Sequence, residues 1–513
     1  MKEPTATRPA RVGLVSLGCA KNLVDTEVMV GMLLRAGLEV TNEAAQADVV
    51  IVNTCAFIDS AKEESVNAIL QSVEWRNWKQ RGQGVVVAGC LPQRFRSQLP
   101  VLLPEVDAFV GLDQVPQIVD VVRQVLARRP PSQSCTSRGG TIEAPPLVRI
   151  SPRSRYIPDY ATPRFRLTPH HFAYVKIAEG CNHPCSFCVI PRIRGAYRSR
   201  PQADIVAEAK TLVASGVREL NLISQDSTCY GMDLRPDRGN FSRPERFGAA
   251  RKSLSRPVST ISTLLRELNA VPGDFWIRLL YTHPAHWTDE LIQTIAECPK
   301  VARYLDIPLQ HIHPNMLERM RRETSREHIL NLIHRIRAGI PGVTLRTAFI
   351  VGFPGETEAC FEALLDFIRE TRFERLGVFT YSREEGTRAG KMGGQVPEKI
   401  KQKRRNLALA AQRKIAAQVA ESFVGRTIKV LIEGSANLAE LRRTHTNPRE
   451  YASARRKLRL AGKPAGRFLM ARSEADAPGI DGRVYIQGQL PVGAFAWVKI
   501  IDHMDYDLIA EPD

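Results

Sequence analysis

The sequence predicts an α/β protein of three successive parts: a doubly wound parallel sheet, a partial (βα)6 barrel and a small C-terminal β-barrel. Continuous apolar strands alternate with amphipathic helices over residues 10–127, and the same alternation returns over residues 170–420. Buried strands separated by helices are typical of parallel sheets covered by helices. Helical periodicity stops near Val424, and only short strand-like runs follow. These three observations carry the fold prediction.

The first part is predicted over residues 10–127. Its expected strands are 12–17, 48–53, 84–88 and 107–110, with helices such as 22–36 and 58–73 between them. Ligands of doubly wound sheets bind beyond the carboxyl ends of the strands. We therefore expect a functional site of this part to follow its strands.

Residues 128–168 are rich in proline, serine and arginine and are predicted to be a linker. The second part is predicted over residues 169–421. Its expected strands are 172–178, 218–224, 276–281, 303–309, 344–350 and 375–381. Six strands with intervening helices indicate an open version of the eightfold barrel, in which active sites collect at the carboxyl ends of the strands.

The third part is predicted over residues 422–513. Its expected strands are 427–433, 467–471, 484–487, 495–501 and 506–510. Five short strands with glycine-containing turns favour a small β-barrel of the kind that contacts nucleic acid or covers an active site.

Composition is that of a soluble globular protein in 513 residues, a length that predicts about three domains. The start of the chain is polar, and no apolar run approaches the roughly 18 residues that span a bilayer, so no export signal and no membrane segment are expected. Ten cysteines in such a chain indicate reduced thiols and metal ligation. The compartment that fits is the cytoplasm.

Lysine and arginine outnumber aspartate and glutamate by 72 to 54, a formal net charge of +18. This excess suits a polyanionic partner such as RNA or a ribonucleoprotein, and it suits an ordinary basic enzyme equally well. Much of it lies in two polar stretches, residues 235–256 and 442–467, which are predicted to be flexible insertions.

Three cysteines stand within eight residues, directly after the first strand of the second part. Cys181, Cys185 and Cys188 have C-x3-C-x2-C spacing. Three thiolates can hold three irons of a cubane cluster and leave the fourth iron open to a small molecule. The alternative is a zinc site with His183 or a distant group as fourth ligand. Zinc motifs usually come as two separated pairs, and the sequence has no second C-x2-C, so the spacing favours the cluster.

Three further cysteines follow three different strands of the first part. Cys19, Cys55 and Cys90 are far apart in sequence, and each alone would more often be a small buried hydrophobic residue. Because parallel strands end at the same edge of a sheet, the three are expected to converge there. Glycine directly before Cys19 and Cys90 suits close backbone approach to a bulky inorganic group. The pattern predicts a second three-cysteine cluster.

With these residues in place, the sequence resembles the radical S-adenosylmethionine (SAM) enzymes, and within them the methylthiotransferases. The resemblance covers nearly the whole chain outside the linker and the basic insertions. It implies an N-terminal methylthiotransferase domain, a radical SAM domain and a C-terminal TRAM domain. It also implies two 4Fe–4S clusters, one held by Cys181, Cys185 and Cys188 and an auxiliary one held by Cys19, Cys55 and Cys90.

Two branches of that family differ in substrate. One branch modifies isopentenylated adenosine beside the tRNA anticodon, and the other (RimO type) modifies an aspartate of small-subunit ribosomal protein twelve. The chain is similar to the ribosomal-protein branch in residues 53–58, 223–228, 230–231, 306–311, 352–357, 381–387 and 476–482. The tRNA branch is expected to carry an asparagine-rich turn at Gln225-Asp226-Ser227 and Gln-Ser-Gly at Gln310-His311.

The resemblance implies that reduction of SAM yields a 5′-deoxyadenosyl radical, and that sulfur on the auxiliary cluster is methylated and delivered to the substrate carbon. Gln225, Asp226 and Arg346 are predicted to bind SAM, Arg346 through the SAM carboxylate; loop capping and structural ion pairs remain alternatives for them. The expected partners are the ribosomal protein or the ribosome, a low-potential donor of flavodoxin or ferredoxin type, and ribosomal RNA. Two alternatives to methylthiolation of the ribosomal protein remain. One is the tRNA branch, and the other is a non-catalytic iron–sulfur protein that binds ribosomes.

Overall fold

The structure, a computed structural model, describes residues 8–78, 82–128, 145–234, 243–252, 259–436, 441–442, 456–457 and 468–513. The two predicted basic insertions therefore lie largely outside the described residues. Within the first of them, helix α8 (Pro244–Lys252) is described.

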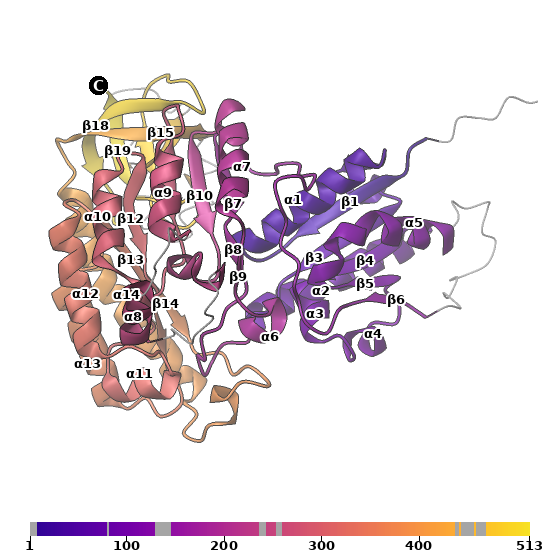
Figure 1. Cartoon of the computed structure of the whole chain (residues 1–513), viewed down its shortest axis with the longest axis horizontal. Coiled ribbons are helices and arrows are strands. Elements are labelled where there is room, and N and C mark those ends of the chain that lie inside the picture. Colours follow the sequence, from indigo (N-terminus) through magenta and orange to yellow (C-terminus); the bar gives the residue numbers. More distant parts are fainter. Residues whose placement is uncertain are drawn as a thin grey trace, which may run out of the picture.

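The first part is a parallel six-stranded sheet with strand order β2-β1-β3-β4-β5-β6 (Figure 1). Its strands are β1 (Arg11–Ser16), β2 (Glu39–Thr41), β3 (Val49–Thr54), β4 (Gly84–Gly89), β5 (Ala108–Val110) and β6 (Leu147–Arg149). The helices are α1 (Ala20–Arg35), α2 (Asp59–Trp78), α3 (Cys90–Arg94), α4 (Leu99–Leu102) and α5 (Ile118–Arg128). Every residue of β3 and β4 is buried, as expected for central strands covered on both faces.

Two edge strands of this sheet have no counterpart in the prediction. β2 and β6 are three residues long, which is too short for an apolar pattern to show. β6 lies in the segment predicted to be a linker, and it pairs in parallel with β5 from Ala108 to Val110. Part of that segment therefore extends the first sheet.

The second part is an open parallel sheet with strand order β14-β13-β12-β11-β10-β7. Its strands lie at the six predicted places: β7 (Phe172–Lys176), β10 (Glu219–Ile223), β11 (Trp276–Leu279), β12 (Val301–Asp306), β13 (Thr344–Val351) and β14 (Arg375–Thr380). A short ribbon of β8 (Ala178–Glu179) and β9 (Arg198–Ser199) flanks the cysteine loop, and helix α6 (Ile190–Arg194) lies between them in sequence. The fold class predicted for this part is confirmed.

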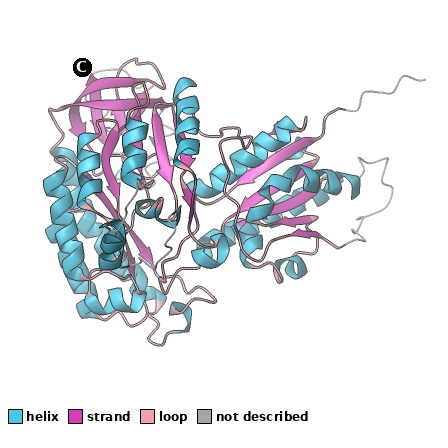
Figure 2. Ribbon diagram, viewed as in Figure 1, coloured by secondary structure: helices cyan, strands magenta, loops and turns pink. Residues whose placement is uncertain are grey.

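Helices line one side of this sheet and form the largest core of the molecule with it (Figure 2). They are α7 (Gln202–Ala214), α9 (Ile261–Asn269), α10 (Asp289–Glu297), α11 (Pro314–Met320), α12 (Arg326–Gly339), α13 (Glu358–Thr371) and α14 (Glu398–Glu421). Four of these helices begin where a serine or threonine side chain accepts a backbone N–H, at Thr260, Thr288, Ser325 and Thr357. Such caps satisfy donors that the first helical turn leaves free.

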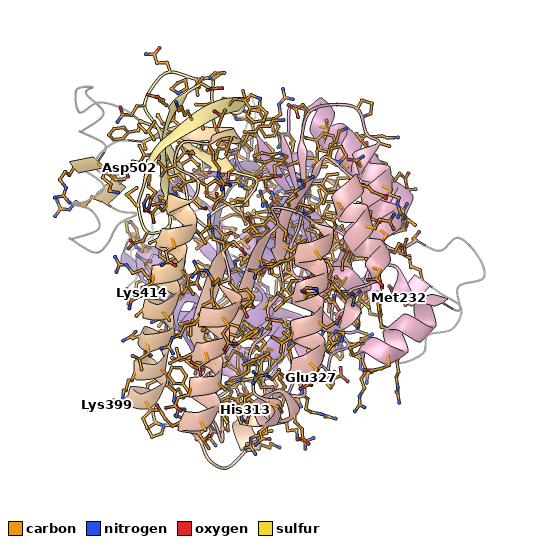
Figure 3. The ribbon with its side chains drawn as sticks, turned by 90° about the vertical axis from the view of Figure 1, so that its left-hand side faces the viewer. Met232, His313, Glu327, Lys399, Lys414 and Asp502 are labelled. Carbon is orange, nitrogen blue, oxygen red and sulfur yellow. The ribbon has the colours of Figure 1, made fainter. Side chains whose placement is uncertain are left out.

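The third part is a closed five-stranded barrel with strand order β15-β16-β17-β19-β18, as predicted. Its strands are β15 (Thr427–Ala436), β16 (Phe468–Ser473), β17 (Val484–Ile486), β18 (Phe495–His503) and β19 (Leu508–Pro512). Figure 3 shows α14 running from Lys399 past Lys414 toward this barrel, where Asp502 lies.

Residues from the first and third parts pack together against the central sheet. Val24 of α1 and Ala477 of the barrel share one buried cluster with Ile223, Leu280 and Tyr304. The barrel is also tied to the sheet by a buried carboxylate, Glu219 of β10, which pairs with Arg278 of β11 and Arg472 of β16. Burial would raise the pKa of Glu219, but the two guanidinium groups lower it to about 2.

No described helix combines the length and the apolar character that crossing a membrane requires.

Candidate functional site

Cys181, Cys185 and Cys188, here called the local triplet, lie in a loop between β8 and α6. Cys181 donates its backbone N–H to Gly195 O, and Cys188 donates to Cys185 O across the loop. Two sulfurs accept backbone N–H groups at 3.5 Å: Cys181 Sγ from His183 and Cys188 Sγ from Ile190. The loop thus folds around its own thiols.

A buried carboxylate, Asp226, attaches this loop to the end of β10. Its Oδ2 accepts from His183 Nε2 at 2.9 Å and lies 2.6 Å from His286 Nδ1. Its Oδ1 accepts from the backbone and the hydroxyl of Thr228. Burial would raise the pKa of Asp226, but His286 and His183 hold it well below the usual value. Burial would likewise lower the pKa of His183, yet the carboxylates of Asp226 and Glu323 raise it to about 9.

His183, Asp226, His283 and His286 each place one potential metal-ligand atom within 4.8 Å of the others. The carboxylate already accepts four hydrogen bonds. His183 stacks on His283 with ring centroids 3.7 Å apart and planes inclined by 16°, so their in-plane nitrogens do not converge on one ion. These contacts make the group a hydrogen-bonded anchor of the loop. His183 Nε2 lies 2.9 Å from Asp226 and Nδ1 lies 3.5 Å from Glu323, and a zinc site that includes His183 stays an alternative.

The opposite side of the loop is held by the last residues of α11 and by Arg322, which follows that helix. Ser186 donates its backbone N–H to Met320 O and its hydroxyl to Arg319 O, both within 2.9 Å. Arg322 Nη1 lies 3.6 Å from Cys185 Sγ and donates to it. N–H groups directed at sulfur are typical of iron–sulfur sites, where they adjust the reduction potential.

Cys19, Cys55 and Cys90, here called the distributed triplet, lie at the carboxyl edge of the first sheet. The strands β1, β3 and β4 are neighbours there. Cys19 precedes α1 and is exposed, Cys55 directly follows β3, and Cys90 begins α3 and is buried. A Cβ built on Gly18 would lie 2.8 Å from Cys55 Cβ, so only glycine allows the strand ends to approach this closely. The Gly18 φ of 89° also favours glycine.

Asparagine side chains tie the end of β1 to the end of β3, and a serine holds the residue after β3. Asn22 Nδ2 donates to Leu17 O at 2.7 Å, and Asn53 Nδ2 donates to Asn22 O at 2.9 Å. Cys55 donates its backbone N–H to the Ser65 hydroxyl, which in turn donates to Cys55 O. Contacts of this kind bring residues distant in sequence into one rigid edge.

The two triplets meet across a buried charged network. Arg194, at the end of α6, donates through Nη2 to Cys90 Sγ at 3.4 Å. Its Nη1 bonds Glu179 at 2.9 Å and Asp25 at 3.2 Å. Lys176 pairs with the same two carboxylates. The helix that follows the local triplet therefore touches a member of the distributed triplet.

The residues predicted to bind SAM have protein partners in this structure. Gln225 Nε2 donates to Glu179 at 2.6 Å, and its Oε1 is buried with no partner among the described residues. The Asp226 carboxylate is fully engaged as the loop anchor. Arg346 donates to Asp306 at 2.6 Å and lies 3.5 Å from Asp481 of the barrel. Of the three, Gln225 alone keeps a buried polar atom available for a ligand, and binding of SAM by these residues stays a prediction.

Sequence reasoning did not single out Arg194, Arg322 or Lys21, although each contacts or adjoins a predicted cluster cysteine. Arg194 and Lys21 lie a few residues from cysteines, which is the only signal that could have found them. Arg322 is distant in sequence from Cys185, and only the fold brings them together.

The six thiols fit ligands of iron–sulfur clusters. Burial raises the pKa of Cys90 and of Cys188 to about 12 and raises the pKa of Cys55 and Cys181. A bound metal would favour the thiolate form of each. None of the described cysteines forms a disulfide.

Family comparisons divide the chain in the same order as the fold. Residues 11–111 match the uncharacterized protein family UPF0004, residues 175–368 match the radical SAM superfamily, and residues 460–512 match the TRAM domain.

Two curated relatives are similar to this chain over nearly its whole length. One, from Opitutus terrae, is 53% identical and is described as ribosomal protein uS12 methylthiotransferase RimO; the match covers 98% of this chain and 96% of the relative. Another with the same description, from Akkermansia muciniphila, is 48% identical over 98% of this chain and 100% of the relative. Among solved structures, the radical S-adenosylmethionine methyltransferase TsrM from Kitasatospora setae is 16% identical with a TM-score of 0.49, covering 75% of this chain and 74% of that one.

Proposed function

This chain belongs to the family of ribosomal protein uS12 methylthiotransferases (RimO), and from that premise we propose that it adds a methylthio group to the β-carbon of an aspartate in uS12. One observation carries the proposal: the Arg194 guanidinium, on the helix after the local triplet, donates to Cys90 of the distributed triplet. A radical and a sulfur donor can act on one carbon only if their sites share one space, and this contact joins the two sites.

The residues divide the cofactors between the two triplets. Cys181, Cys185 and Cys188 would hold the 4Fe–4S cluster that binds SAM, and Cys19, Cys55 and Cys90 would hold the auxiliary 4Fe–4S cluster. When bound, the clusters and SAM supply the electron, the hydrogen-abstracting adenosyl radical and the transferred sulfur and methyl group.

The protein itself positions and insulates these groups. Asp226 and Ser186 fix the cysteine loop from two sides, and Arg322 and Arg194 direct N–H groups at Cys185 and Cys90. Such N–H bonds favour the more negative, reduced state of a cluster. Burial of Cys90 limits the access of water, which would hydrolyse an exposed cluster.

The proposed partners follow from the substrate. The enzyme would meet uS12 free or on the ribosome, and the basic chain with its C-terminal barrel would contact ribosomal RNA. A low-potential donor of flavodoxin or ferredoxin type would reduce the clusters. With a ribosomal substrate, the reaction would take place in the cytoplasm.

Mass spectrometry of uS12 and of tRNA from a strain that lacks this chain tests the proposal. We expect uS12 to lose the mass of one methylthio group, and complementation with the intact gene to restore it. Loss of the methylthio mass from tRNA with uS12 unchanged would overturn the proposal in favour of the tRNA branch.

A further inference from the structure

Lys21 is a buried cation with no hydrogen-bond acceptor in the part of the chain that the structure describes. It lies in the first turn of α1, two residues after Cys19, and only 6% of its surface is exposed. Its ammonium lies over the Tyr281 ring, 2.9 Å from the centroid, and among the described residues it donates to no oxygen. Buried ammonium groups are normally paired, because the loss of water is costly otherwise.

Two carboxylates that attract Lys21 are already engaged by other groups. Glu179 and Asp306 both act electrostatically on Lys21. Glu179 accepts from Lys176, Arg194 and Gln225. Asp306 accepts from Arg346 and from the Tyr281 backbone. Neither carboxylate is within ion-pair distance of Lys21, so its positive charge is available to a further anion.

The end of α1 reinforces this positive charge. Cys19 is the N-cap and makes no side-chain cap, and the first turn of α1 contains no acidic residue. The free N–H groups of a helix N-terminus attract anions and disfavour cations. A lysine in that turn is therefore unfavourable alone and favourable once an anion is bound beside it.

Tyr281 completes the site from the central sheet. It follows β11 with a φ of 59°, a left-handed conformation that is uncommon for a residue with a side chain. Cys19 lies two residues before Lys21, as the N-cap of the same helix. Lys21 and Tyr281 thus come from the two parts that carry the two triplets and meet beside Cys19.

We propose that Lys21, with the N-terminus of α1, binds the side-chain carboxylate of the substrate aspartate and holds its β-carbon between the two triplets. This inference rests on the proposed function. It assigns a carboxylate as the ligand, and the carboxylate of SAM is the other source of the same chemistry. The position of Lys21 beside Cys19, outside the loop of the local triplet, favours the substrate.

The test compares Lys21→Met and Lys21→Arg with the wild-type holoenzyme. Two ligands are used: purified uS12 and its variant with asparagine at the modified aspartate. We measure the affinity of both proteins for the enzyme by fluorescence anisotropy, and the affinity of SAM by equilibrium dialysis. Iron content and thermal unfolding check that each variant is folded and loaded.

We expect Lys21→Met to weaken binding of uS12 about 10-fold or more, because it leaves a buried carboxylate unpaired. Lys21→Arg keeps the charge and should lose less. The asparagine variant of uS12 should bind wild-type enzyme and Lys21→Met equally, and the affinity of SAM should not change.

Three results would overturn the inference. Equal weakening of both uS12 proteins would make Lys21 a structural residue. Weaker binding of SAM alone would assign the site to the SAM carboxylate. Unchanged affinity for uS12 would remove any role in binding. Failure of the proposed function is separate, because it appears as wild-type enzyme that leaves uS12 unmodified whatever the variants do.

Discussion

The two cysteine triplets are built from the chain in opposite ways. The local triplet takes its three thiols from eight consecutive residues of one loop. The distributed triplet takes one thiol from the end of each of three neighbouring strands, β1, β3 and β4. The first depends on how one loop is anchored, and the second depends on the register of a sheet.

The comparison shows that closeness in sequence does not make a site self-sufficient. The local loop is fixed by Asp226, which follows β10, and by the last residues of α11, both distant in sequence. The distributed triplet needs fewer outside anchors, because parallel strands bring their carboxyl ends to one edge. Each triplet then receives one arginine N–H, Cys185 from Arg322 and Cys90 from Arg194.

The largest effect is expected from removing one thiol of each triplet. Cys185→Ala should abolish SAM cleavage and keep the auxiliary cluster, whereas Cys55→Ala should keep SAM cleavage and abolish methylthiolation. Each variant should retain about four irons where the wild type holds about eight, since each cubane has four. Iron analysis and 5′-deoxyadenosine formation under anaerobic conditions measure both. Formation of 5′-deoxyadenosine by Cys185→Ala would show that the roles are assigned wrongly.

The second largest effect is expected from removing Asp226, which anchors the loop of the local triplet. Asp226→Asn leaves the His183 cation buried without its carboxylate, and we expect a loss of about 3–5 kcal/mol in the free energy of unfolding. The exposed Asp366→Asn, which breaks only a surface pair with Arg369, should cost less than about 1 kcal/mol. Denaturant titration measures both variants. Equal costs for the two would mean that Asp226 does not anchor the loop.

Alanine substitutions at two glycines distinguish backbone strain from a steric clash with Cys55 of the distributed triplet. Gly18 and Gly37 both have positive φ, 89° and 79°, so alanine at either should cost about 1–2 kcal/mol. A Cβ at Gly18 meets Cys55 at 2.8 Å, whereas a Cβ at Gly37 meets nothing within 4 Å. We expect Gly18→Ala alone to lose iron from the auxiliary site, as counted by metal analysis. Full iron in Gly18→Ala would show that the strand ends tolerate separation.

The smallest effect is expected from the two arginines. Arg322→Lys and Arg194→Lys keep the charge and remove the planar donor from Cys185 and Cys90, respectively. Each change should shift the reduction potential of its own cluster to a more negative value and leave the other cluster unchanged. Redox titration followed by electron paramagnetic resonance resolves the two clusters. A shift of both potentials by either variant would show that the sites do not act separately.

The predicted strands and the predicted cluster cysteines can both be recognised from a local pattern in the sequence. Long buried strands such as β3 and β13 show an apolar run, and a thiol that directly follows such a run stands out. The edge strands β2 and β6 are too short to show a pattern, and β6 was hidden in a proline-rich segment. Arg346 was noticed for its charge at a strand, yet its partners Asp306 and Asp481 come from β12 and from the barrel.

The sequence by itself determined the three-part α/β order, the six thiols and their division into two sets, because strand periodicity and cysteine spacing are local properties of the chain. Tertiary structure alone decided which side chains surround those thiols. The meeting of Arg194 with Cys90, of Asp226 with His183 and of Lys21 with Tyr281 depends on how α1, α6 and the ends of β10 and β11 pack. The positions of long charged side chains show no periodicity in the sequence from which their partners could be predicted. Once such a charge is buried away from water it must be paired, and the packing of the elements decides which group is close enough.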